Sequence, residues 1–155
     1  MMARETFRTE GFKELERALA EELPRATARN VLRRTATKSM ERIRVKMEQL
    51  APKDEGDLAG SMKTQVVTAK RARGSVRFER STGVQVMTGP APEGKLNRSN
   101  AGWQEEGTVE MSPNPYARPA ADSEGQAVVR EVRDTLADEV NKAKARIARK
   151  AAKGR

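Results

Sequence analysis

The feature that most constrains the fold is a long helical pattern with a proline at each end. Between Pro24 and Pro52 there is no further proline and no glycine. Proline can begin a helix because the first turn does not need its missing N–H, whereas the residue before a proline is pushed out of helical conformation. The sequence therefore predicts a helix over residues 25–50. Apolar side chains recur in it at spacings of three and four residues: Leu32, Ala36, Met40, Ile43, Met47 and Leu50.

Other patterns predict the remaining elements. Gly11–Glu22 has the spacing of a short amphipathic helix, and an apolar seam from Val129 to Ile147 indicates a long C-terminal helix that begins near Ala121. We expect one α+β domain over residues 1–155, with two N-terminal helices, a small antiparallel sheet of three or four strands, and a long C-terminal helix packed on the sheet. The segments predicted as strands are Ser61–Val67, Ser75–Arg80, Gly83–Thr88 and Ala101–Glu106.

Two segments are predicted to lack regular structure. Residues 89–102 contain two prolines and hardly an apolar side chain, which indicates a long exposed loop. Residues 148–155 indicate a basic, frayed tail. The core is expected to be thin because the chain has only five aromatic residues, and a thin core favours completion by partner subunits.

Composition argues against catalysis. The chain has no histidine and no cysteine, so the commonest general base, the commonest zinc ligand and every thiol nucleophile are missing. Glu105 and Glu106 would point to opposite faces of a strand and so could not act as an acid–base pair. We expect no enzyme activity, no catalytic residue, no metal site, no cofactor and no small-molecule substrate. No apolar run approaches the roughly 18 residues of a membrane span, so no membrane association is expected.

Positive charge is concentrated in two segments of a chain whose net charge is +9. Residues 25–46 carry eight basic side chains and one acid, and residues 141–155 carry seven basic side chains and no acid. Four of the first group recur every four residues along one side of the predicted helix: Arg34, Lys38, Arg42 and Lys46. This basic ridge has three open interpretations: contact with DNA phosphates, contact with an acidic neighbouring subunit, or exposure to solvent.

Two short motifs lie about forty residues apart. The first is Ala51-Pro52-Lys53-Asp54-Glu55-Gly56-Asp57-Leu58-Ala59-Gly60-Ser61. The second is Trp103-Gln104-Glu105-Glu106-Gly107-Thr108, which continues into Pro115-Tyr116-Ala117-Arg118-Pro119-Ala120. Trp103 could be a core residue or an interface residue. The proline-rich part could be the rigid entry to the last helix, a contact segment, or both, because Tyr and Arg are favoured at interfaces.

The order of these motifs resembles that of the small neck proteins of siphophage-type tailed bacteriophages, called head–tail joining, minor tail or tail-completion proteins. The resemblance extends from about Gly11 to Ile147 and depends on Ala51-Pro52, Gly56, Leu58, Ser61 and the second motif. Two positions depart from the family pattern. The usual Asp-Thr-Gly is Asp54-Glu55-Gly56, and the usual Phe of Glu-Phe-Gly-Thr is Glu106. The latter places a charge where an apolar side chain normally packs.

The resemblance implies a structural virion protein at the head–tail junction, assembled in the host cytoplasm. Such proteins form rings around the DNA channel, with six copies as the best guess, between the head connector or stopper and the tail terminator or tube. Non-specific contact with packaged DNA is compatible with that role. The candidate interface residues are Trp103, Glu106, Pro115, Tyr116 and Arg118. The alternative hypothesis is a sequence-independent nucleic-acid-binding protein that uses the basic ridge and the basic tail.

Overall fold

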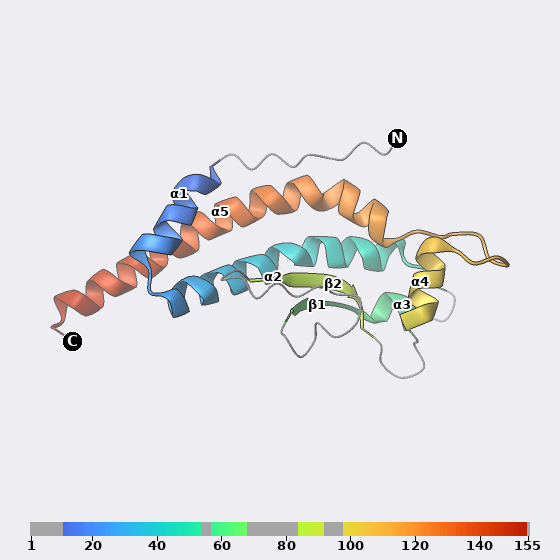
Figure 1. Ribbon diagram of the computed structural model, residues 1–155, viewed down its shortest axis with the longest axis horizontal. Helices are drawn as coiled ribbons and strands as arrows, with labels where there is room; N and C mark the ends of the chain where they lie inside the picture. Colours follow the sequence, from blue (N-terminus) through green and yellow to red (C-terminus); the bar gives the residue numbers. More distant parts are fainter. Residues whose placement is uncertain (1–10, 54–56, 68–83, 92–97, 155) are drawn as a thin grey trace.

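The computed structural model describes residues 11–53, 57–67, 84–91 and 98–154 (Figure 1). Most of these residues are helical, and the strands form one small antiparallel sheet. In chain order the elements are α1 (Phe12–Arg17), η1 (Ala18–Glu22, a π-helical turn), α2 (Arg25–Leu50), α3 (Asp57–Gly60), β1 (Met62–Val66), β2 (Val86–Pro90), α4 (Arg98–Glu106) and α5 (Ala117–Ala152).

Helix α2 has the bounds that its flanking prolines predict. Pro24 precedes the first helical residue, and its carbonyl accepts the first helical hydrogen bond from the N–H of Ala28 at 2.9 Å. Ala51 has an extended backbone, with φ −61° and ψ 141°, as expected of a residue that precedes proline. The short N-terminal helix is also confirmed, as α1 continued by η1.

Helix α2 is the central layer of the molecule. The long helix α5 packs along one side of it, and β1 and β2 pack on another side (Figure 1). The C-terminal helix was expected to pack on the sheet, and this is wrong because α2 covers the strands. Element η1 contacts both α2 and α5, and α1 packs against the C-terminal half of α5.

The buried apolar side chains form two clusters at opposite ends of α2. The first joins η1, α2 and the C-terminal half of α5, with Val31 and Val140 among its most buried members. The second joins the end of α2 to α3, β1, α4 and the beginning of α5, and it contains Met47, Tyr116 and Ala120. The core is therefore thin, as the composition predicts, and it is divided.

Polar groups occupy α2 between the two clusters. Thr35 and Ser39 are buried there, and their hydroxyl groups have no hydrogen-bond partner among the described residues. Ion pairs between Arg34 and Glu139 at 3.1 Å and between Arg42 and Glu124 at 3.0 Å join α2 to α5 beside this stretch. These pairings require α2 and α5 to run antiparallel.

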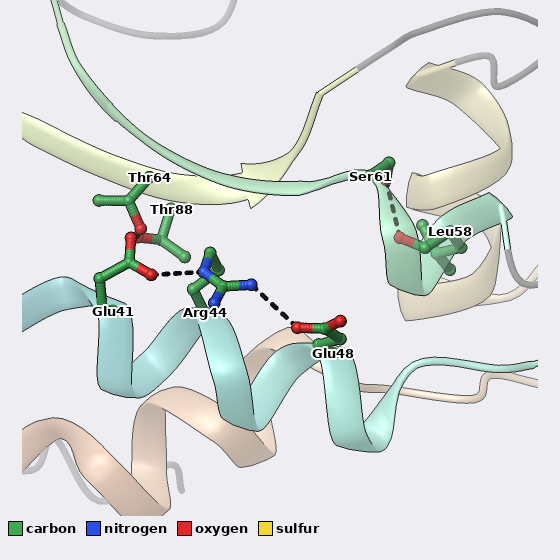
Figure 2. Close-up of polar contacts among 7 residues, drawn as sticks. All are labelled: Glu41, Arg44, Glu48, Leu58, Ser61, Thr64 and Thr88. Atoms are coloured by element: carbon green, nitrogen blue, oxygen red, sulfur yellow. Dashed lines mark hydrogen bonds and ion pairs between the residues drawn. The ribbon is translucent and has the colours of Figure 1, made fainter.

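A second polar layer lies where α2 faces the two strands (Figure 2). The guanidinium of Arg44 donates to Glu41 at 2.6 Å and to Glu48 at 2.9 Å. Hydrogen bonds from Arg44 and from the β1 hydroxyl of Thr64 hold the pKa of Glu41 below its ordinary value, although burial acts in the opposite direction. Thr64 also pairs with Thr88 on β2 at 3.1 Å, so hydrogen bonds connect the helix to both strands.

The sheet is smaller than predicted within the described residues. The first and third expected strands correspond to β1 and β2, which pair antiparallel with Met62 opposite Pro90 and Val66 opposite Val86. The expected strand at 75–80 lies outside the described residues. The expected strand Ala101–Glu106 is wrong, because this segment belongs to helix α4.

Two segments that were expected to lack regular structure contain helical or strand residues. Of the expected exposed loop 89–102, residues 89–90 belong to β2 and residues 98–102 belong to α4, while 92–97 lie outside the described residues. The expected frayed tail is helical as far as Ala152, since α5 continues through Lys150. Lysine and arginine side chains favour a helix C-terminus because they oppose its negative dipole end.

We predict that removing the unpartnered hydroxyl groups stabilises the protein. Thr35→Val keeps the shape of the side chain and removes a buried group that has lost its bonds with water. The free energy of unfolding should rise by about 1 kcal/mol, and Ser39→Ala should act in the same direction. Urea unfolding monitored by circular dichroism measures the change. Val31→Ala is the contrasting variant and should lower stability by about 2 kcal/mol. A loss of stability in both hydroxyl variants would contradict this account.

Candidate functional site

The second motif forms one structural unit at the junction of α4 and α5. Helix α4 ends at Glu106, and a coil leads through Pro113 and Pro115 to the first turn of α5. Figure 1 shows this coil extending beyond the end of the helical layers. One side chain joins the two halves of the motif through three hydrogen bonds.

That side chain is the carboxylate of Glu105, which caps α5 from outside the helix. Oε2 accepts the backbone N–H groups of Tyr116 and Ala117, each at 2.8 Å, and Oε1 accepts that of Arg118 at 2.9 Å. The next residue, Pro119, has no N–H, and the N–H of Ala120 bonds to the carbonyl of Tyr116. Every backbone donor of the first turn therefore has a partner or does not exist.

The charge of Glu105 suits this position. Burial acts to raise its pKa, but the three backbone N–H groups and the nearby guanidinium of Arg118 outweigh that effect and hold the pKa below its ordinary value. The positive end of the α5 dipole acts in the same sense. Glu105 is thus ionised at neutral pH, and its charge is used within the chain.

Tyr116 is a core residue of this junction. It is 2% exposed, and its hydroxyl donates to the carbonyl of Ala101 on α4 at 3.3 Å. Burial, with a smaller contribution from Glu105, raises its pKa to about 12, so the phenol remains protonated. The expectation that this side chain contacts a partner is corrected, since it is enclosed between α4 and the start of α5.

The coil between α4 and α5 is ordered by its own hydrogen bonds. Gly107 has φ +77°, and a Cβ atom there would lie 2.8 Å from the carbonyl oxygen of Met111. The Thr108 hydroxyl accepts the N–H groups of Glu110 and Met111, and the N–H of Asn114 donates to Gln104. Glycine is therefore required where α4 ends, and the coil has a fixed shape.

This unit presents apolar groups to solvent. Trp103 on α4 is 50% exposed, and Val109 in the coil is fully exposed. Pro115 is exposed as well, and Arg118 lies 3.4 Å from Glu106 in an ion pair in which both side chains are more than half exposed. Four of the five candidate interface residues are therefore accessible: Trp103, Glu106, Pro115 and Arg118.

A hollow of about 370 Å³ lies beside these residues. Three proline rings form its apolar part, and acidic side chains lie around it together with one arginine. Glu105 is committed to capping α5, whereas Asp122 is exposed and has no ion pair among the described residues. The lining residues are Pro113, Pro115, Pro119, Glu105, Glu106, Arg118 and Asp122.

The basic ridge is placed at the seam between α2 and α5. Arg34 and Arg42, two of its four residues, are bound to acids of α5, with Arg42 also 3.9 Å from Glu131. Lys38 is exposed and Lys46 is half-buried, and neither has an ion pair among the described residues. The positive charges of Arg34 and Arg42 are thus partly neutralised within the chain.

The described part of the chain holds neither a cluster of metal ligands nor a membrane-spanning helix. It contains no group of three or more acidic side chains placed to hold a metal ion. None of its helices combines the length and the hydropathy that crossing a membrane requires.

Sequence reasoning missed the capping role of Glu105. It placed Glu105 in a strand, where it would have no reason to reach the last helix. Gly107 was the available signal, because a glycine directly after a polar segment commonly marks the end of a helix. Its N–H does bond to the carbonyl of Trp103 four residues earlier, at 2.7 Å.

No protein-family model, curated protein or solved structure shows a significant match to this chain. The resemblance to phage neck proteins therefore rests on the motifs and on their order.

We predict that Glu105→Gln destabilises the protein at neutral pH by roughly 1–2 kcal/mol, the usual value of a helix cap. The neighbouring Glu106→Gln is the matched control and should change stability by less than about 0.5 kcal/mol, because its ion pair is exposed. Chemical unfolding of both variants measures the difference. Equal effects of the two substitutions would contradict the capping role.

The same cap predicts a pH dependence. Because the pKa of Glu105 is lower in the folded chain than in the unfolded chain, its stabilisation is present above the unfolded pKa of about 4.3 and is lost as pH falls through the folded pKa. Unfolding of wild type and Glu105→Gln at a series of pH values should show their difference shrinking at acidic pH. A difference independent of pH would show that the charge is not involved.

A third prediction concerns Tyr116. Tyr116→Ala should lower the free energy of unfolding by about 3–5 kcal/mol, because it leaves a cavity in the cluster that joins α2, α4 and α5. Tyr116→Phe loses only the bond to Ala101 and should cost about 1 kcal/mol. Thermal and urea unfolding measure both. A folded alanine variant of wild-type stability would contradict the core assignment.

Proposed function

We propose that this chain is a structural protein of the neck of a tailed phage, which forms a ring at the head–tail junction and docks the tail to the head connector. The observation that carries the proposal is the single rigid unit formed by the two halves of the second motif. Glu105 from the first half holds the helix that begins in the second half. The residues of the motif can thus be explained by their structural role at this junction, with no catalytic role.

What this unit displays supports a docking role. It combines a half-exposed tryptophan, exposed prolines and an exposed arginine on a backbone fixed by internal hydrogen bonds. Tryptophan and arginine are enriched among the residues that dominate binding energy, and a rigid backbone loses little entropy on association. Isolated exposed side chains need no explanation, but several on one fixed protrusion are typical of an interaction surface.

The alternative, sequence-independent binding of nucleic acid, has weaker support. Arg34 and Arg42 would have to exchange their acidic partners on α5 for phosphates. That exchange lowers the expected gain from each contact, because the existing ion pairs must first be broken. Lys38 and Lys46, which have no ion pair with any described residue, are compatible with incidental contact with DNA in a channel.

We predict that Trp103→Ala and Arg118→Ala leave the chain folded but block completion of virions. Both side chains are at least half exposed, so each substitution should change the free energy of unfolding by less than about 1 kcal/mol. Loss of a hot-spot contact weakens docking by roughly 2 kcal/mol, or about thirtyfold. Infectious titre and electron microscopy of lysates measure the result, with unjoined heads and tails expected.

The matched control is Arg130→Ala, which removes an exposed arginine of α5 away from the junction. It should support normal particle yields. Normal yields from the Trp103 and Arg118 variants would overturn the proposed docking role of this surface.

A further inference from the structure

The two ends of α5 differ in the charge of the side chains around them. The hollow at the α4–α5 junction combines three proline rings with Glu106 and Asp122, and its net side-chain charge is negative even with Arg118 included. Glu105 already occupies the N–H groups that begin α5, so the positive end of that helix is offset. A cation that enters the hollow would therefore meet carboxylates and apolar rings.

The opposite end of α5 has the complementary composition. Arg146, Arg149 and Lys150 are exposed and have no ion pair among the described residues. Ile147 lies among them and is 37% exposed. An arginine or lysine side chain can place its aliphatic stem on proline rings while its charged end reaches a carboxylate. This end therefore matches the hollow both in charge and in apolar surface.

The two surfaces cannot meet within one copy. Asp122 and Arg149 lie on the same continuous helix, at a separation of about 40 Å for a rise of about 1.5 Å per residue. A contact between them must therefore join two copies, and it would use a different surface on each. Such heterologous contacts generate closed rings or open filaments.

We infer that the basic C-terminal end of α5 of one copy docks in the acidic, proline-lined hollow at the α4–α5 junction of the next copy. The inference rests on the proposed ring and specifies one of its subunit contacts. Asp122 and Glu106 receive the basic side chains, and Ile147 packs against the proline rings.

Sedimentation velocity of the full-length chain over a concentration series tests this contact. Wild type should self-associate, and rising salt should weaken the association because the partners are charged. Asp122→Ala alters the hollow, and Arg149→Ala combined with Lys150→Ala alters the basic end. Each variant alone should associate on the order of tenfold or more weakly than wild type. Arg130→Ala removes one charge from an exposed face of α5, as Asp122→Ala does from the hollow, and should associate like wild type.

An equimolar mixture of the two variants gives the sharpest outcome. The hollow variant retains an intact basic end, and the basic-end variant retains an intact hollow, so one contact can form between them. The mixture should form dimers and nothing larger, because the remaining surfaces of that dimer are both altered. Circular dichroism of each variant should match wild type, since all the substituted side chains are exposed.

Two results would overturn the inference. If both variants associate as strongly as wild type, the copies meet elsewhere, and the proposed ring stands without this contact. If wild type is monomeric throughout the series, the contact is absent. The virion assay with Trp103→Ala then still decides whether the chain docks in a phage neck.

Discussion

The structure depends on the burial of α2 on two of its sides. A chain with few aromatic residues cannot build one large core, and here the apolar side chains are divided between two clusters at the ends of α2. Helix α2 runs from one cluster to the other, and the antiparallel helix α5 packs along it over the same distance. Every other described element is positioned by contact with one of these two helices or with their ends.

Polar groups fill the places where apolar side chains are missing. Toward the sheet, Arg44 joins Glu41 and Glu48 of α2, and Glu41 is linked through Thr64 to both strands. Toward α5, Thr35 and Ser39 are small enough to be buried between the clusters, but they leave hydroxyl groups unpaired. Exposed ion pairs beside them contribute little to stability, but they fix which residues of α5 lie opposite α2.

The sequence predicted correctly those helices whose own residues carry a clear signal. The prolines at 24 and 52 set the bounds of α2, and the three-and-four spacing identified α5, because a continuous apolar seam has no other common use. The error at Ala101–Glu106 has a physical cause. Nine residues are too few for a strong helical period, and α4 is stabilised by contacts that sequence does not display, such as the bond from Tyr116 to Ala101.

The sequence could locate the site but could not assign a role to each of its residues, because those roles also lack a local signal. The residue types and order of the second motif identified the junction, but not the roles of its two adjacent glutamates. Consecutive residues of a helix point about 100° apart, so Glu105 faces the first turn of α5 while Glu106 faces solvent. Glu106 stands where the phage neck proteins that this chain resembles usually have an apolar residue, and its charge is not buried. Its exposed pair with Arg118 is weak, so in the proposed ring it could be exchanged for a contact with another subunit.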